Sequence, residues 1–385
     1  MYEKERLQAE LQERRLKKER NRLGKLLVFL QAVLTVGVIL LVLILDMFPL
    51  KYVVVLSSML GILWLITLLT QSFRISRGMG KVYALLMLAL LTVGISYLWK
   101  TNSMLTDLTG GEILGFLSDV DVAEEPFTIY VSGNDSYGEV TLEEGRSDVN
   151  ILLTVNPNTR QILMTTTPRD YYVELPFGEG CWDKLTHAGN YGIDCSMQTL
   201  ERLYDVEIDY YLRVNFSGFE SIVDALGGVE VYSDYAFTSL HSGYYFDVGY
   251  NSVDGAEALA FVRERYAFEE GDVQRGKNQM AMIRAIMDKA TSPAVISGYL
   301  SLMDSVSDSF ITNMPKGSIS DLVKMQLNEG GSWNIVSNSV NGYVSEAYTY
   351  SDSSQLLSVM MQDEASVQHA SELIEKCENG EVLSD

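Results

Sequence analysis

The sequence has 385 residues, enough for one large domain or two medium ones, and a formal net charge of −22. Residues 1–25 carry nine Lys or Arg and five Asp or Glu, whereas the residues after 100 carry 15 Lys or Arg and 45 Asp or Glu. This acidic balance excludes nucleic acid as the main partner, because a phosphate backbone requires a basic surface.

Three stretches near the N-terminus are apolar enough to cross a bilayer, which requires roughly 20 predominantly apolar residues. They are residues 26–48, 52–71 and 82–99. The third has only 18 residues, so a buried core helix is its alternative, but it ends in Tyr97 and Trp99, which suit the membrane interface. The pattern predicts three transmembrane helices. A cleaved signal peptide fits poorly, because the apolar stretch is too long and recurs twice.

The positive charges set the expected orientation. The basic arm at 1–25 and the turn RISRGMGK at 74–81 should both stay in the cytoplasm. Three spans then place everything after Lys100 outside. The arm could alternatively bind nucleic acid, but its interleaved glutamates favour a solvated helix at the lipid surface.

A short tether at 101–126, partly helical at GEILGFL, leads into one domain at 127–380. Strands are predicted at 127–133, 149–156, 161–168, 209–216 and 229–233. Helices are predicted at 196–206, with Ser196 as its cap, at 217–226, stopped by Gly227 and Gly228, and at 272–290. A loop rich in Tyr and Gly fills 235–251, and 253–267 should pass from a short helix into a strand. This alternation predicts an α/β fold, a layered α-β-α domain with a central mixed β-sheet.

Positive charges gather in FVRERYAFEEGDVQRGKNQ, residues 261–279, inside this acidic domain. If residues 261–265 form a strand, Arg263 and Arg265 point to one face, because side chains there alternate. Arginine suits phosphate recognition, since its planar guanidinium holds two oxygens at once and keeps its charge. The alternative is ordinary surface ion pairing, because Glu264 lies between the two arginines and Glu269, Glu270 and Asp272 lie nearby.

The helix that follows carries three more polar candidates. Arg275 and Gln279 are four residues apart and therefore share a face. Asp272 stands where a helix N-cap belongs. A strand end, a glycine turn and a helix start would together bring two or three guanidinium groups toward one point. For Asp272, a capping role and a catalytic role both stay open.

Two further segments place polar residues at strand ends, where ligands of α/β sheets bind. Asp135 follows one predicted strand, and Arg146 and Asp148 precede the next. Two carboxylates with a guanidinium between them suit an oxygen-liganded Mg²⁺ that also contacts a phosphate. In TTTPRDYYVELP, Pro168 ends the strand because it has no N–H, which leaves Arg169 at the rim of the sheet.

Cysteine and histidine usage limits other chemistry. Cys181 and Cys195 flank WDKLTHAGNYGID and would either close a disulfide outside the cell or stay as unpaired thiols, and Cys377 is the odd one. No CxxC or Cys/His spacing indicates zinc, and three histidines leave little for a His-based metal site.

Four blocks in order resemble those of the LytR–CpsA–Psr family. They are RSDVNILLTVNPNTRQILMTTTPRDYYVELP, KLTHAGNYG, VNFSGFESIVDALGGVEV and ALAFVRERYAFEEGDVQRGKNQ. The resemblance covers about 127–380, and the ordered set is highly specific. Three spans before the domain resemble the capsule-type members, some of which carry an extra domain that residues 101–126 are too short to hold.

The resemblance implies a membrane-anchored phosphotransferase. Members transfer an anionic glycopolymer, such as capsular polysaccharide or teichoic acid, from a polyprenyl-pyrophosphate carrier to peptidoglycan and release polyprenyl phosphate. A bound pyrophosphate with Mg²⁺ or Mn²⁺ explains why cations gather in an acidic domain, because phosphoryl transfer needs positioned groups that neutralise charge. It also implies a bacterial cell membrane location, with the N-terminus in the cytoplasm and the catalytic domain outside.

The resemblance also implies residue roles. Asp135 and Asp148 match the metal-binding carboxylates. The residues that match pyrophosphate-binding positions are Arg146, Arg169, Arg263, Arg265, Arg275, Gln279 and Lys184. The catalytic set is Arg263, Arg265, Asp272 and Asp148, and either aspartate is a candidate for the general base. Because KLTHAGNYG departs from the commoner NAAYAYGG-like block, the roles of His187 and Asn190 stay open.

Two other functions would use the same domain. A hydrolase would cleave polyprenyl pyrophosphates with water as acceptor, and its products would distinguish it. A non-enzymatic membrane regulator of envelope polymer assembly would tolerate alanine at Arg263 and Asp135. A transcription factor fits poorly, because the domain is acidic and expected outside the cell.

Overall fold

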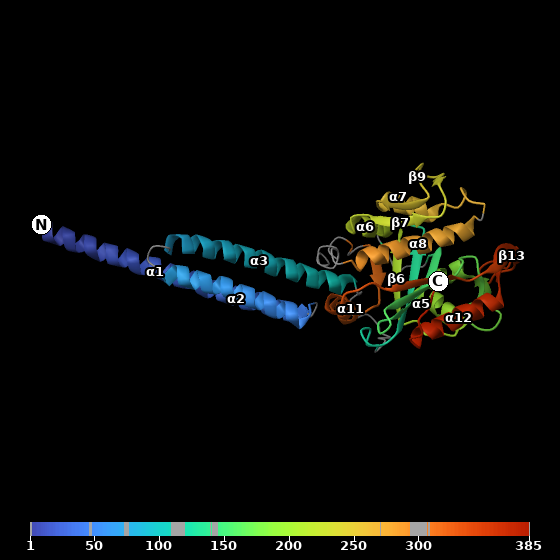
Figure 1. Cartoon of the computed structure of the whole chain (residues 1–385), viewed down its shortest axis with the longest axis horizontal. Helices are drawn as coiled ribbons and strands as arrows, with labels where there is room; N and C mark the ends of the chain where they lie inside the picture. The colour runs from blue at the N-terminus through green and yellow to red at the C-terminus, as the bar shows by residue number, and fades with distance from the viewer. Residues whose placement is uncertain are drawn as a thin grey trace. The chain divides into compact units, whose positions relative to one another are not determined.

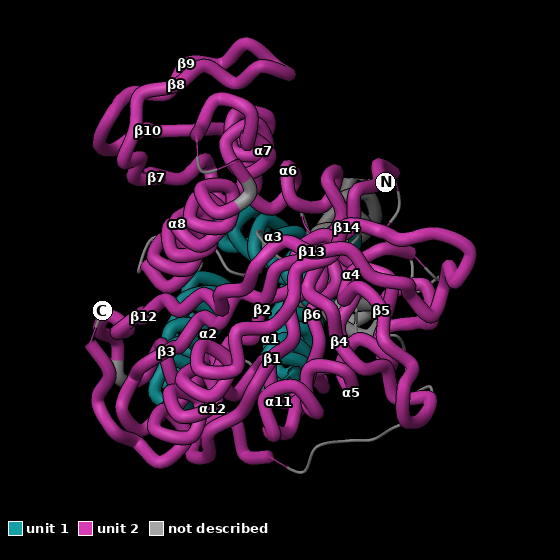
Figure 2. Tube along the Cα trace, turned by 90° about the vertical axis from the view of Figure 1, so that its right-hand side faces the viewer, with its two compact units in different colours: residues 1–103 teal, residues 104–385 magenta. Residues whose placement is uncertain are grey.

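The computed structural model describes residues 2–45, 48–72, 77–108, 120–138, 140, 145–269, 271–292, 306 and 309–384. The chain divides into two compact units, residues 1–103 and residues 104–385 (Figure 2). The predicted helix at GEILGFL in the tether lies outside the described residues.

Three long helices form the first unit. They are α1 (Tyr2–Leu45), α2 (Leu50–Ser72) and α3 (Arg77–Leu108) (Figure 1). Each contains a stretch long and apolar enough to cross a membrane: Arg22–Leu45, Leu50–Gln71 and Gly78–Lys100. Only 17% of the apolar stretch in α3 is buried, which fits a lipid-facing helix rather than a core helix. The helices therefore indicate membrane anchoring.

A six-stranded mixed sheet forms the centre of the second unit, with strand order β11-β6-β1-β2-β3-β12. Its strands are β1 (Phe127–Asn134), β2 (Val149–Asn156), β3 (Gln161–Thr166), β6 (Tyr210–Asn215), β11 (Phe310–Thr312) and β12 (Asn334–Ser339). β1 pairs in parallel with β6, and β3 with β12, while the other neighbours are antiparallel. The predicted hairpin of β2 and β3 is confirmed.

Helices cover both faces of this sheet. One apolar core joins Leu152 and Leu163 to α5 (Ile193–Tyr204) and α12 (Glu364–Glu378). The opposite face packs against α8 (Asp272–Ala290) and α11 (Lys316–Glu329). Figure 1 shows α8 and α12 on opposite sides of the strands. The predicted α-β-α layering with a central mixed sheet is confirmed.

A smaller lobe has its own apolar core at one end of the sheet (Figure 2). It contains α6 (Phe216–Ala225), β7 (Val229–Ser233), β8 (Phe237–Thr238), β9 (Tyr245–Phe246), β10 (Gly249–Val253) and α7 (Gly255–Arg263). The segment predicted as a loop at 235–251 thus holds short strands, and β10 pairs with β7.

The predicted strand at 261–265 is wrong, because α7 continues through Arg263. An Asp254 capping box starts this helix, and Ala258, Leu259 and Phe261 bury its inner face. The apolar run that suggested a strand is therefore the core-facing side of a short helix.

Two predicted caps are also wrong. α5 begins at Ile193 with Gly192 at the N-cap, so Ser196 lies inside the helix, where it is buried. α8 begins at Asp272, but Gly271 occupies its N-cap position with φ of 54°. Only glycine adopts that backbone conformation freely, and this explains why the turn uses it.

Smaller elements border one side of the main sheet. They are β4 (Tyr172–Glu174), β5 (Trp182–Lys184), α4 (Leu185–Ala188), the 3₁₀ turn η1 (Gly189–Tyr191), β13 (Gly342–Ala347) and β14 (Leu357–Gln362). β4 pairs with β5, and β13 with β14.

The C-terminal residues fasten the end of the β2–β3 hairpin. Asn156 Nδ2 donates to the carbonyl oxygens of Cys377 at 2.8 Å and Glu378 at 3.2 Å. Gln161 Nε2 donates to the Glu381 carbonyl at 2.6 Å, and its Oε1 accepts from the Leu383 N–H at 3.0 Å. The last turn of the chain thereby satisfies polar side chains that would otherwise be buried without partners.

Candidate active site

The first three strands bring Asp135, Asp148 and Arg169 to one edge of the sheet. β1 and β2 are antiparallel, with Gly133 opposite Val149. Asp135 after β1 and Asp148 before β2 therefore lie at the same end. β3 is antiparallel to β2, so the chain after β3 reaches that edge as well. The structure places all three where the strand-end argument placed them, and their roles stay predictions.

Backbone hydrogen bonds fix the loop at 145–148 to the segments around it. The Gly145 N–H donates to the Gly189 carbonyl (3.1 Å), and the Ser147 N–H donates to the Thr186 carbonyl (3.2 Å). The Asp148 N–H donates to the Gly133 carbonyl (2.8 Å), and the Thr186 N–H donates to the Arg169 carbonyl (2.8 Å). A Cβ atom on Gly189 would lie 2.4 Å from the Gly145 carbonyl oxygen, so the approach requires glycine. The loop thus has a position defined by backbone bonds.

Charged side chains alternate in sign along this edge. Arg169 Nη1 lies 2.9 Å from Asp148 Oδ1, and Arg169 Nε lies 3.5 Å from Asp170 Oδ2. Asp170 Oδ1 in turn contacts Lys184 Nζ at 3.0 Å. The Arg169 and Asp148 side chains are 30% and 22% exposed, so an incoming anion or cation can reach them. Lys184 belongs to the block KLTHAGNYG, which departs from the commoner family pattern, yet it joins the same row of charges.

Arg263 reaches the sheet edge from the smaller lobe. Its guanidinium carbon lies 4.2 Å from the centre of the Phe216 ring, and its Nη1 donates to the Tyr137 hydroxyl at 3.2 Å. Tyr137 follows β1 and Phe216 follows β6, and these strands are parallel neighbours. The last turn of α7 therefore brings Arg263 to the segment after β1 that carries Asp135.

Glu264, which lies between the two predicted arginines, holds the turn that follows it. Its Oε1 accepts from the N–H groups of Arg265, Tyr266 and Ala267 at 2.8 to 3.1 Å, and its Oε2 accepts from Leu240 at 2.7 Å. Burial opposes its charge, but these backbone bonds lower the pKa of the Glu264 carboxyl. The Glu264 carboxylate therefore binds backbone N–H groups and does not form the predicted alternative ion pair with Arg263 or Arg265.

The structure does not bring every predicted residue into contact. Asp135 and Arg146 are exposed on the edge loops. Arg265 packs on the neighbouring Tyr266 ring, 4.5 Å from its centre. Gln279 lies on α8, as does Arg275, and its Nε2 donates to the Val262 carbonyl at a distance of 3.5 Å. The side chain of Asp272 lies outside the described part of the chain.

Arg213 in β6 is a buried cation that the sequence analysis did not single out. It is 2% exposed, and its Nε has no hydrogen-bond partner. Within the described residues, no carboxylate lies at ion-pair distance from it. Burial lowers the pKa of Arg213, against the influence of Tyr130 and Tyr211. Its side chain lies behind the edge loop, since Nη2 would lie 3.4 Å from a Cβ on Gly145.

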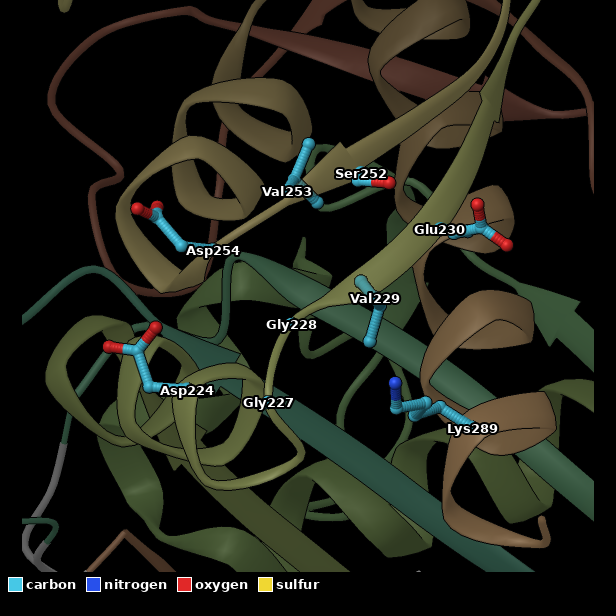
Figure 3. A pocket seen from close by; sticks show the side chains of 9 residues that line it. All are labelled: Asp224, Gly227, Gly228, Val229, Glu230, Ser252, Val253, Asp254 and Lys289. Carbon is cyan, nitrogen blue, oxygen red and sulfur yellow. The ribbon is translucent and has the colours of Figure 1, made fainter. Parts of the chain in front are cut away.

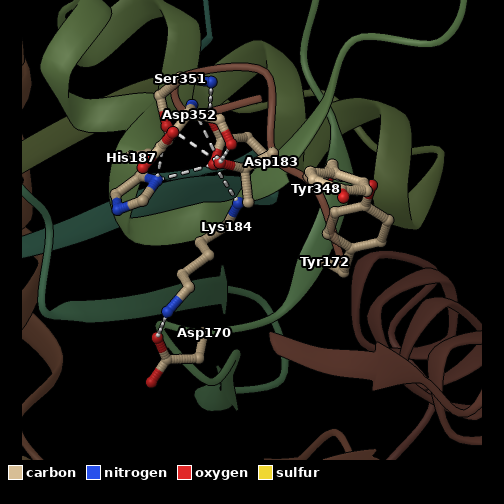
Figure 4. A network of polar contacts seen from close by, with 9 residues as sticks. Asp170, Tyr172, Asp183, Lys184, His187, Tyr348, Ser351 and Asp352 are labelled. Atoms are coloured by element: carbon tan, nitrogen blue, oxygen red, sulfur yellow. Dashed lines mark hydrogen bonds and ion pairs between the residues drawn. The ribbon is translucent and has the colours of Figure 1, made fainter. Parts of the chain in front are cut away.

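A second network, shown in Figure 4, includes the histidine whose role the sequence left open. Asp183 Oδ1 and Ser351 Oγ both contact His187 Nδ1, at 2.7 and 3.0 Å, and Ser351 N–H donates to Asp183 Oδ2 at 2.8 Å. A Ser–His–Asp nucleophile uses the two different ring nitrogens, so this arrangement is structural. Burial opposes the charge, but bonds from His187 and Ser351 lower the pKa of Asp183.

Of the two alternatives left open for Cys181 and Cys195, the structure shows unpaired thiols. Cys181, Cys195 and Cys377 are free thiols. Cys181 and Cys195 pack in one apolar cluster with Leu175 and Ala188, and burial raises the pKa of Cys195 to about 11. A thiol held neutral in this way packs as a small apolar group.

The metal prediction depends on Asp135 and Asp148. In the described ranges, no three His, Cys, Asp or Glu side chains gather as a metal cluster. Two carboxylates at one sheet edge still fit Mg²⁺, which usually keeps several waters and binds through one or two carboxylates and substrate phosphates.

A pocket of about 380 Å³ lies apart from this edge (Figure 3). It is lined by Asp224, Gly227, Gly228, Val229, Glu230, Ser252, Val253, Asp254 and Lys289. Asp224 Oδ1 accepts from the Gly255 N–H at 2.7 Å, and Asp254 caps α7, so both carboxylates have structural partners. None of the predicted site residues lines this pocket.

Comparisons with known proteins identify relatives of this chain. The chain is 36% identical over 205 residues to the polyisoprenyl-teichoic acid–peptidoglycan teichoic acid transferase TagU of Enterococcus faecalis, covering 53% of this chain and 66% of that protein. It is 36% identical over 201 residues to the protein of the same name from Bacillus mycoides, covering 52% and 64%. The chain thus spans slightly less than two thirds of the length of these relatives.

Solved structures share the fold of the second unit. TagV from B. subtilis matches with a TM-score of 0.55 and 25% identity, covering 66% of this chain and 98% of that chain. A structure described as TagT bound to LIIa-WTA matches with a TM-score of 0.54 and 26% identity, covering 69% and 94%. The model of the LytR_cpsA_psr family matches residues 101–368. The chain therefore belongs to the LytR_cpsA_psr family.

Proposed function

We propose that the protein transfers an anionic glycopolymer, as its glycan phosphate, from a polyprenyl-pyrophosphate carrier to peptidoglycan. The observation that carries the proposal is the row of alternating charges formed by Asp148, Arg169, Asp170 and Lys184, with Arg263 on the same edge. The names of the TagU relatives specify polyisoprenyl-linked teichoic acid and peptidoglycan, which supports this class of reaction.

The cations would bind the pyrophosphate. Arg169 and Lys184 stand on the sheet side, and Arg263 approaches from the smaller lobe. The other proposed phosphate contacts are Arg146, Arg265, Arg275 and Gln279. Arg213 supports the proposal from behind the edge loop, because a buried cation with no carboxylate at ion-pair distance among the described residues favours an anion nearby.

Asp135 and Asp148 would hold Mg²⁺ or Mn²⁺. When bound, the ion neutralises charge on the phosphate oxygens as the leaving group departs. Asp148 also contacts Arg169, so the same carboxylate orients a phosphate-binding cation. This dual contact links the metal-binding residues to the phosphate-binding ones.

The proposed reaction is a transfer of the glycan phosphate to a sugar hydroxyl. A sugar hydroxyl oxygen of peptidoglycan attacks the glycan-side phosphorus, and the bond from that phosphorus to the bridging oxygen breaks. Polyprenyl phosphate leaves with the bridging oxygen, while Arg169 and Arg263 stabilise the developing charge. The hydroxyl proton passes to a base, for which Asp148 and Asp272 are the proposed candidates.

The proposal also includes a location for the chain, at the cell membrane with the second unit outside. The three apolar helices anchor it in the cell membrane. The basic arm and the turn at 74–81 stay in the cytoplasm, because positively charged loops are retained there. The second unit then lies outside, where peptidoglycan is.

The proposal is tested by supplying the full-length protein in lipid nanodiscs with a polyprenyl-pyrophosphate-linked glycan, Mg²⁺ and peptidoglycan. Arg263→Ala should lower glycan transfer by about 10²-fold, the cost of losing one preorganised charge donor. Lys184→Ala should also lower transfer. Lys324→Ala is the matched control, because Lys324 forms a similar contact with Asp321 at 3.1 Å.

The products separate the alternatives. Free glycan phosphate without joined peptidoglycan would indicate a hydrolase instead. Full envelope polymer in cells that carry both Arg263→Ala and Asp135→Ala would indicate a regulator and contradict the proposal.

A further inference from the structure

Three exposed rings from distant segments meet beside the charged row. The Phe177 ring centre lies 5.0 Å from that of Tyr191 and 5.6 Å from that of Tyr350, and the two tyrosines are 6.1 Å apart. Their exposures are 48%, 39% and 50%. We call these residues the aromatic trio. Large apolar surface in water is costly, and a contiguous patch of it usually marks a binding surface.

Buried polar bonds hold the trio in place. Tyr350 N–H donates to the Trp182 carbonyl at 2.7 Å. The next residue, Ser351, is fixed to the buried Asp183 and His187 pair shown in Figure 4. A buried carboxylate is costly unless it is fully bonded. Asp183 bonds to Ser351 and so fixes the turn that carries Tyr350, which preorganises the Tyr350 ring.

The trio is connected to the candidate active site through β5. Trp182 and Asp183 support Tyr350, and the next residue, Lys184, contacts Asp170. Asp170 contacts Arg169 in turn. The chain after β5 also bonds to the edge loop, because Ser147 N–H donates to the Thr186 carbonyl. The trio and the charged row are therefore joined through β5 and the bonds of its residues.

The surrounding charge selects the kind of ligand. The segments that supply the rings, 174–183, 189–194 and 348–354, contain five carboxylates and no Lys or Arg. Asp183 is buried, which leaves four exposed or half-buried carboxylates, and Arg202 is a neighbouring cation that donates to the Leu175 carbonyl at 3.4 Å. Such a surface repels phosphate-rich polymers and anionic lipid head groups. It does not repel a sugar without charge. The C–H groups on one face of a pyranose ring are weakly positive and apolar, which complements the negative face of an aromatic ring.

We infer that the aromatic trio binds N-acetylated sugar rings of the acceptor glycan strand and holds its hydroxyl toward the Arg169 edge. This inference rests on the proposed function, and it assigns the acceptor to the β5 side of the site. The anionic donor glycan would be directed away from this surface by its carboxylates.

The test uses full-length protein in nanodiscs without any lipid-linked donor. Binding is measured to a tetramer of N-acetylglucosamine and to peptidoglycan sacculi freed of attached polymer. Tyr350→Ala and Phe177→Ala should each weaken binding about tenfold, equivalent to ~1.4 kcal/mol. Tyr350→Phe keeps the ring and should restore affinity. Tyr250→Ala is the control, since Tyr250 is 77% exposed and pairs with Tyr232 at 5.3 Å on the β7–β10 hairpin.

Thermal unfolding of each variant checks that the fold is intact, and vesicles of anionic lipid test the competing partner. The inference is overturned if the wild-type protein binds neither glycan, if Tyr350→Ala binds as well as wild type, or if the variants lose vesicle binding instead. Because no donor or turnover is involved, glycan binding can succeed even where the transferase proposal fails.

Discussion

Arg213 and Glu264 are buried charged residues with opposite surroundings. Arg213 has no carboxylate at ion-pair distance among the described residues, whereas Glu264 accepts four backbone N–H groups. An uncompensated buried charge costs free energy, and a fully bonded one is tolerated. Substituting each residue should therefore change the free energy of unfolding in a different direction.

Arg213→Met should leave the ligand-free protein as stable as wild type or more stable, because replacing a buried charge by an apolar side chain is neutral or stabilising by ~1–4 kcal/mol. Inorganic pyrophosphate with Mg²⁺ should raise the unfolding temperature of wild type more than that of the variant. The control is Arg284→Met, which removes the bond from Arg284 Nη2 to the Ile335 carbonyl at 2.5 Å and should destabilise. Equal destabilisation by both substitutions would contradict the prediction.

Glu264→Gln should lower the free energy of unfolding at pH 7 by about 1–3 kcal/mol, because neutral acceptors bind the four N–H groups less strongly. The folded pKa of Glu264 lies below its ordinary 4.5, so its charge stabilises the fold above pH 4.5. That contribution is lost as pH falls through the folded pKa. Denaturant titrations of both proteins across acidic pH should show the difference shrinking, and a constant difference would count against this role.

At the scale of elements, the edge loop depends on α4 and η1. Gly189 in η1 lies so close to the Gly145 carbonyl that a side chain does not fit. The loop at 145–148 carries Arg146 and Asp148, and its position depends on this contact. A packing change at Gly189 is therefore transmitted to the charged row without touching any charge.

Gly189→Ala should lower glycan transfer by displacing the edge loop, while the far side of the domain stays folded. Transfer rate and thermal unfolding are measured together. Gly243→Ala provides a contrast, because no atom lies within 4 Å of its Cβ position and only its backbone, with φ of 77°, would be strained. If Gly243→Ala reduced transfer as much as Gly189→Ala, the edge-loop explanation would fail.

The spacing of apolar residues and the positions of turn residues predicted most of the sheet and the long helix at 272–290, because both are local properties of the sequence. They misassigned 261–265, since an apolar helical face and a buried strand look alike over five residues. Strand ends located Asp135, Asp148 and Arg169 at one edge. The burial of Arg213 and the bonds that join Ser351 to Asp183 and His187 depend on segments far apart in the sequence, so local patterns could not reveal them.

At the scale of the whole molecule, the three spans should put the second unit outside the cell. In a Cys181→Ser background, Tyr250→Cys should react with a membrane-impermeant thiol reagent on intact cells. Met79→Cys should react only after permeabilisation. Both native side chains are 77% exposed, so accessibility alone does not separate them. Labelling of Met79→Cys first would reverse the proposed topology.

The attachment of the C-terminal turn to the β2–β3 hairpin bears on how the protein is made. Asn156 bonds to a carbonyl 221 positions later, so this bond can form only after Cys377 has left the ribosome. Domains of this size fold as units, and a nascent chain without its end remains loose. Delayed formation of this bond would suit the proposed location of the second unit outside the cell, because a chain that is not yet folded can pass through a translocation channel.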